Sequence, residues 1–72
     1  MKVYFEFCNR DIKPFEIEIS ALPKKGQLIH FNNIYDDYSE PVYCRFKVKK
    51  VELHYDLETI KEKIVIPLKA IN

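Results

Sequence analysis

The sequence has no tryptophan, a single glycine and only two cysteines among its 72 residues. Two cysteines form at most one intramolecular disulfide, whereas secreted domains of this size usually carry several. We therefore expect Cys8 and Cys44 to be reduced packing residues of a cytoplasmic protein. The lone Gly26 follows Pro23 and two lysines, and glycine takes a positive φ without strain, so this segment is predicted to be a tight turn.

Long apolar runs are also missing. Residues 1–7 alternate between polar and apolar side chains, so they lack the continuous apolar core of a signal peptide. No stretch approaches the roughly 18 consecutive apolar residues that a membrane-spanning helix needs. The sequence thus predicts neither a secretion signal nor contact with a membrane.

Neither sign of charge is in clear excess. Twelve lysines and arginines stand against eleven aspartates and glutamates, which gives a formal net charge of +1. The overall charge steers the protein only weakly toward nucleic acid or an anionic membrane, so any such role depends on local patches.

What the sequence does contain is apolar residues in a regular order. Hydrophobic residues make up 47% of the chain and include five phenylalanines and five tyrosines, which is enough for a core and argues against disorder. A chain of this length has room for one core, so residues 1–72 are predicted to form a single domain.

Alternation of polar and apolar residues with a period of two predicts five β-strands. The first two, over residues 2–8 and 13–20, are separated by a short polar connection and are predicted to form a hairpin. The other three are predicted over residues 28–31, 42–56 and 64–68.

The strand over residues 42–56 organises the predicted sheet. Its apolar residues fall into two sets of opposite parity: Cys44, Phe46 and Val48 before Lys49–Lys50, and Val51, Leu53 and Tyr55 after it. A one-residue β-bulge or a sharp bend at Lys49–Lys50 turns both sets toward one core, which is how a small sheet curls into a barrel.

The C-terminal third of the chain contains two features for which the sequence allows alternative structures. Residues 56–62 suit either the tip of a hairpin or one short helical turn behind an Asp56 N-cap. Pro67 has no N–H to donate, which predicts that the last strand lies at an edge of the sheet or has a free stretch near its end. The predicted fold class is all-β, a five-stranded and strongly bent antiparallel sheet that closes as a small barrel.

Three motifs carry a resemblance to a known group of proteins. They are Pro23-Lys24-Lys25-Gly26-Gln27-Leu28-Ile29, Phe46-Lys47-Val48-Lys49-Lys50-Val51 and Ile64-Val65-Ile66. In this order they resemble the Pro-x-x-Gly-Asp-x-Val, Tyr-x-Val-x-x-Val and terminal-strand pattern of many short bacterial and phage proteins with Src-homology-3-like barrels. Gln27 replaces the usual Asp, and Phe46 the usual Tyr. The resemblance spans residues 22–68 and implies a fold, because these small proteins share no common function.

Residues 32–41 form the longest segment without a regular period, and loops on a rigid scaffold often carry function. The acidic and aromatic residues in and beside it are predicted to bind a partner: Tyr35, Asp36, Asp37, Tyr38, Glu40 and Tyr43. The segment is similar to the acidic, aromatic-lined loop with which Src-homology-3 domains hold proline-rich or basic peptides. The absence of tryptophan argues against a polyproline groove. In the alternative interpretation, Ile34 and one tyrosine anchor the loop and the carboxylates only keep it soluble.

The leading functional hypothesis is a small, non-catalytic binding protein that contacts another protein through residues 32–43. An accessory protein or inhibitor of phage or mobile-element origin would fit this description. The alternative hypothesis is a nucleic-acid or nucleotide binder that contacts phosphates through a basic strand face: Arg45, Lys47, Lys49 and Lys50. These lysines also suit a solvated strand face that discourages edge-to-edge pairing.

Cofactors, metals and catalysis find no support in the residue spacing. His30, His54 and the two cysteines lie far apart in the sequence, and no close Cys-x-x-Cys pair occurs. No Ser/His/Asp or Cys/His arrangement is evident, so no enzyme activity is expected. The first strand, with Tyr4 and Cys8, or the last strand offers an edge for pairing with a second copy, and both a monomer and a homodimer remain open.

Overall fold

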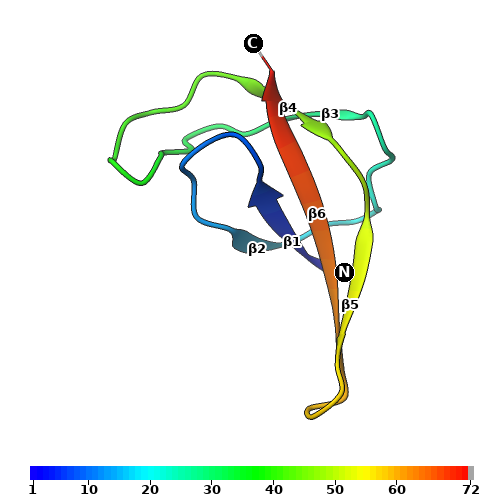
Figure 1. The fold of residues 1–72 in the computed structure, drawn as a ribbon. Helices are drawn as coiled ribbons and strands as arrows, with labels where there is room; N and C mark the ends of the chain where they lie inside the picture. The colour runs from blue at the N-terminus through cyan, green and yellow to red at the C-terminus, as the bar shows by residue number, and fades with distance from the viewer. Residues whose placement is uncertain (72) are drawn as a thin grey trace.

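A computed structural model describes residues 1–71, which form six β-strands in one curled sheet (Figure 1). The strands are β1 (Lys2–Phe7), β2 (Phe15–Glu18), β3 (Leu28–His30), β4 (Arg45–Val48), β5 (Glu52–Asp56) and β6 (Lys61–Ile71). Their order is β2-β1-β6-β4-β3, and β5 pairs with β6 beside this path. The predicted all-β class and the strongly bent small sheet are therefore confirmed. Residues 1–71 contain no helix that could cross a membrane.

The last strand is the centre of the sheet, so the prediction that it lies at an edge is wrong. β6 pairs antiparallel with β4 and β5 on one side and parallel with β1 on the other. The sheet is thus mixed, with one parallel pairing among four antiparallel ones. Because β1 lies between β2 and β6, the two edges predicted to pair with a second copy are largely covered. The terminal strands are β2 and β3.

The predicted bulge is confirmed by the register. Val48 of β4 lies opposite Leu68, whereas Glu52 of β5 lies opposite Val65. Three residues on one side, 49–51, therefore face two residues of β6, which is the one-residue excess of a β-bulge. The long predicted strand is accordingly divided into β4 and β5.

Pro67 fits inside the central strand because it faces this bulge. Its carbonyl accepts a hydrogen bond from the Lys49 N–H at 2.9 Å. The polar backbone groups of one strand residue point to the same side, so the missing N–H of Pro67 falls where the ladder is already interrupted.

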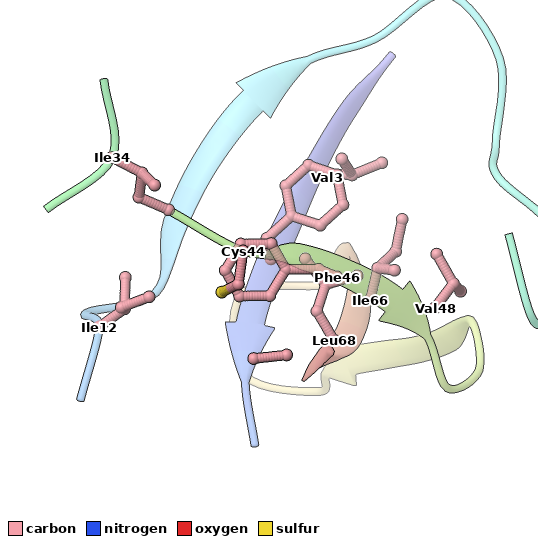
Figure 2. Packing of buried hydrophobic residues seen from close by; sticks show 10 residues of the cluster. Val3, Ile12, Ile34, Cys44, Phe46, Val48, Ile66 and Leu68 are labelled. Carbon is pink, nitrogen blue, oxygen red and sulfur yellow. The ribbon is translucent and has the colours of Figure 1, made fainter. Parts of the chain in front are cut away.

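The core lies on one side of the sheet. Five fully buried side chains of β1, β4 and β6 face it: Val3, Phe46, Val48, Ile66 and Leu68. Val65 is also fully buried, but it has the opposite parity on β6 and lies outside the core cluster. Figure 2 shows Ile12 and Ile34, from two loops, joining the cluster beside Cys44. The predicted inward set Cys44, Phe46 and Val48 is confirmed. Both cysteines are free, but Cys8 is exposed, so a packing role holds for Cys44 alone.

The second half of the bent segment leaves the core instead of joining it. β5 and the first residues of β6 form a two-stranded arm, residues 52–64, that extends downward from the sheet in Figure 1. Leu53 lies opposite Ile64 and so faces the core side, but it is 56% exposed, and Tyr55 is 60% exposed. The prediction that Val51, Leu53 and Tyr55 enter a shared core is therefore wrong, because the arm reaches past the body that would cover them.

A four-residue turn, not a helical turn, closes the arm. Asp56 pairs with Lys61, and the Asp56 carboxylate accepts hydrogen bonds from the Glu58 and Thr59 N–H groups at 2.9 and 3.3 Å. Ile60 has a φ of 53°, which is rare for a β-branched residue. Leu57 and Ile60 are each 89% exposed at this tip.

Candidate functional site

The half-barrel is open between its two terminal strands, β2 and β3, which do not pair with each other. Side chains join them where the backbone does not. The rings of Phe15 and Phe31 lie 5.4 Å apart between centroids with an interplanar angle of 80°. Phe31 also contacts Phe5 and Phe46, at 5.4 and 5.7 Å. The gap between the backbones of β2 and β3, which we call the seam, therefore has a floor of packed aromatic rings.

Two hollows on this seam share Ile17 and Phe31 and together form what we call the seam groove. The larger, of about 540 Å³, is lined by Ile12, Lys13, Phe15, Ile17, Phe31, Asn32, Asn33, Ile34, Tyr35, Asp36 and Asp37. The second, of about 480 Å³, continues along residues 19–23 and Ile29. An apolar floor with a few polar groups at the rim is the usual composition of a binding site.

One wall of the groove belongs to the acidic loop, residues 32–43, which has a defined shape. Its two sides are joined by hydrogen bonds from the Asp36 N–H to the Glu40 carbonyl and from the Val42 N–H to the Ile34 carbonyl, at 2.9 and 3.0 Å. The Asp36 carboxylate accepts bonds from the Tyr38 and Glu40 N–H groups, both at 2.9 Å. This side chain therefore holds the loop in place.

The loop is also tied to the body at two points. Ile34 is buried in the core, as the anchoring interpretation expected. The Asp37 N–H donates to the Asp11 carbonyl at 2.6 Å, which connects the loop to the segment between β1 and β2. No tyrosine of the loop serves as an anchor, since Tyr35, Tyr38 and Tyr43 are 55%, 74% and 88% exposed.

The structure divides the predicted partner-binding residues between two places. Tyr35, Asp36 and Asp37 line the seam groove. Tyr38 and Tyr43, with Asp36, line a hollow of about 350 Å³ on the other side of the loop. Glu40 lines neither of these hollows.

The predicted basic residues are all exposed, but one of them is paired. The Lys50 ammonium lies 2.8 Å from a Glu52 carboxylate oxygen, and His54 contacts the other oxygen at 2.9 Å. The hydrogen bond from Lys50, followed by that from His54, lowers the pKa of Glu52, and the same bond to Glu52 raises the pKa of Lys50. Lys50 therefore belongs to an ion pair at the base of the arm.

Residues 1–71 contain no group of three or more His, Cys, Asp or Glu residues placed to hold a metal ion. They also contain no buried polar or charged side chain. The polar chemistry of the described chain is thus on its surface.

Sequence reasoning identified the acidic loop and missed the floor of the groove. Phe15, Ile29 and Phe31 pack against the core, and Ile17 is 40% exposed on the same side, but the alternation did not reveal that β2 and β3 are terminal. No protein-family model, curated protein or solved structure matches the chain. The resemblance to Src-homology-3-like barrels therefore stays a prediction.

Proposed function

We propose that the protein is a small non-catalytic binding protein that holds an extended segment of another protein in the seam groove. The observation that carries this proposal is the position of the larger seam hollow, which has phenylalanine and isoleucine at its floor and the acidic loop as one wall. Loops positioned by a rigid sheet are a common location for binding. We place this role in the cytoplasm, which suits the two free cysteines, and we propose that the protein is an accessory protein or inhibitor.

The backbone beside the groove is suited to an extended ligand. The Ile19 N–H donates to the Met1 carbonyl, so Ile19 and, by alternation, Ile17 and Phe15 direct their polar backbone groups toward β1. The backbone groups of Glu16 and Glu18 then point away from β1, along the open edge of β2. A partner strand at this edge would gain ladder hydrogen bonds while its alternate side chains enter the groove.

The charge of the wall indicates the chemistry of the ligand. No lysine or arginine occurs between Gly26 and Arg45, and Asp36 and Asp37 outnumber the single cation at the rim, Lys13. Asp36 has one oxygen bound to the loop backbone, which leaves Asp37 as the more available carboxylate. We therefore propose a ligand with apolar residues at alternate positions and a lysine or arginine near one end.

A random twelve-residue peptide library displayed on phage tests this proposal, with the immobilised full-length protein as bait. We expect enrichment of peptides that combine a basic residue with alternating apolar ones. The double variant Tyr35→Ala/Asp37→Asn should lose these peptides, because it removes a wall ring and a carboxylate without touching Asp36 or Ile34. Glu58→Gln, which removes a charge from the arm, is the matched control and should keep them.

Unfolding measurements on both variants separate an effect on binding from an effect on folding. Both variants should unfold within about 0.5 kcal/mol of the wild type, since the substituted residues are exposed. Selection of the same peptides by the double variant, or no enrichment on the wild type, would refute binding in the groove.

A further inference from the structure

The charges of the chain are separated in space although they balance overall. Three segments, residues 20–31, 42–50 and 64–71, contain seven of the twelve lysines and arginines and none of the eleven aspartates and glutamates. These segments carry β3, β4 and most of β6, which lie side by side in the sheet. Strand pairing therefore gathers cations from distant parts of the sequence onto one region.

The register places these cations on the outer face, opposite the core. Lys47 of β4 lies directly opposite Lys69 of β6, and Arg45 lies opposite His30 of β3. Phe46, between Arg45 and Lys47, is fully buried, so its two neighbours point outward. We call Arg45, Lys47, Lys49 and Lys69, all exposed, the outer basic face.

The turn before β3 extends this face. The Gly26 N–H donates to the Val48 carbonyl at 2.8 Å, and a Cβ placed on Gly26 would lie 3.9 Å from the Lys47 side chain. Lys24 and Lys25 precede this glycine and are exposed. The turn thus adds two further cations beside Lys47.

These charges are not compensated within the described chain. The ion pairs of residues 1–71 include none of the four members of the outer basic face. Like charges directly opposite one another, as at Lys47 and Lys69, destabilise a sheet. Glu6, opposite Pro67 on β1, is the carboxylate that the strand register places beside this region. An anionic ligand would relieve the repulsion that the fold leaves in place.

We infer that the outer basic face binds the phosphate backbone of single-stranded nucleic acid. Arg45 and Lys47 occupy alternate positions of β4, about 6.8 Å apart along an extended strand, and Lys49 follows at the start of the bulge. Tyr43, 88% exposed, lies just before them, and an exposed aromatic ring beside cations suits unpaired bases that can stack.

Duplex DNA fits this surface less well. Its major groove takes a helix or a two-stranded ribbon. Residues 1–71 form no helix, and the one protruding ribbon is the arm, whose four carboxylates (Glu52, Asp56, Glu58 and Glu62) outnumber its two lysines, Lys61 and Lys63. Like charge would repel the arm from a phosphate-lined groove. None of the cations of the outer basic face lines the seam groove, so this inference does not depend on the proposed peptide site.

Fluorescence anisotropy with a labelled single-stranded oligothymidylate of about 20 nucleotides tests the inference on the full-length protein. Four phosphate contacts predict that log affinity falls with log salt concentration with a slope of about −2.8. Lys47→Gln/Lys69→Gln should reduce the slope by about 1.4 and should leave thermal stability unchanged or higher, because a like-charge pair is removed. Tyr43→Ala should weaken binding about 5- to 150-fold with the slope unchanged.

The control Lys2→Gln/Lys61→Gln makes the same change in net charge at two exposed positions outside the three segments. It should keep most of the affinity and the slope. No binding at about 50 mM salt, or an equal loss in the control, would overturn the inference. A duplex of the same sequence that binds as tightly as the single strand would overturn the assignment to single strands.

Discussion

Phe31 meets the ring of Phe15 nearly edge-on across the open seam of the half-barrel, with centroids 5.4 Å apart. In a closed barrel, backbone hydrogen bonds would join β2 to β3. Here the two strands are not paired, and this contact between side chains connects them instead. The seam is therefore held by side chains while the backbone edge of β2 stays free. Stability and the availability of the groove thus depend on the same few rings.

Phe31→Ala should lower the free energy of unfolding by about 3 kcal/mol, because the ring contacts four other phenylalanines and its loss leaves a cavity. Urea denaturation followed by circular dichroism measures this change. Tyr38→Ala removes a ring that is 74% exposed and should change the free energy of unfolding by less than about 0.5 kcal/mol. Equal effects of the two substitutions would contradict the role of the aromatic floor.

Ile60→Gly should stabilise the arm by about 1 kcal/mol, because glycine adopts the left-handed backbone of this position without the Cβ strain of isoleucine. The measurement is amide hydrogen exchange in β5, which reports opening of the arm separately from the body. Leu57→Gly is the matched control, since Leu57 has the same exposure but no positive φ. Slower exchange in the Leu57 variant as well would argue that backbone strain at Ile60 is not the cause.

Asp36→Ala should destabilise the protein by about 1 kcal/mol and loosen the acidic loop, because two backbone N–H groups lose their acceptor. Asp37→Ala removes the neighbouring, more exposed carboxylate and should leave stability within about 0.5 kcal/mol. Urea denaturation together with backbone order parameters of residues 35–41 distinguishes the two. The first variant should lower the order parameters, and the second should not.

Acid should open the turn of the arm. Hydrogen bonds from the Thr59 and Glu58 N–H groups lower the pKa of Asp56 below its ordinary value of 3.8. A carboxyl group with a depressed pKa binds protons less readily in the folded state, so its contribution to stability is complete above the ordinary value and is lost as the pH falls through the depressed one.

Amide NMR between pH 5 and 2 should therefore show the Glu58 and Thr59 signals moving toward unfolded positions only in the lower part of this range. Asp56→Asn keeps a carbonyl oxygen as acceptor but does not titrate, and in that variant the two signals should stay nearly constant. Movement of the same size in both proteins would exclude Asp56 as the titrating group.

Much of the fold was predictable because alternation fixes which side of a strand is buried. The opposite parities of Phe46 and Leu53 predicted the one-residue bulge, and the register shows it. Alternation does not specify which strands become neighbours, so the central position of β6 and its parallel pairing with β1 were not predicted. Nor does it distinguish a covered apolar face from an uncovered one, which is why the exposed Leu53 and Tyr55 were assigned to the core.

The candidate site was predictable in part for the same reason. A run of carboxylates and tyrosines without a period is visible in the sequence, and it forms a surface loop. The groove beside it depends on two strands being terminal and unpaired, which is a property of the topology. The gathering of Lys69 next to Lys47 is likewise a result of strand pairing across 22 positions of the sequence, from 47 to 69.

The parallel pairing of β1 with β6 also governs how the protein is made. Tyr4 lies opposite Val65, a separation of 61 positions (65 minus 4), so β1 is synthesised long before its central neighbour β6. Until β6 is made, Phe5 and Phe7 lack the strand that shields them, and pairing across so long a loop is slow. Chains that stop before residue 65 should therefore bind chaperones or aggregate, whereas chains that include β6 should fold.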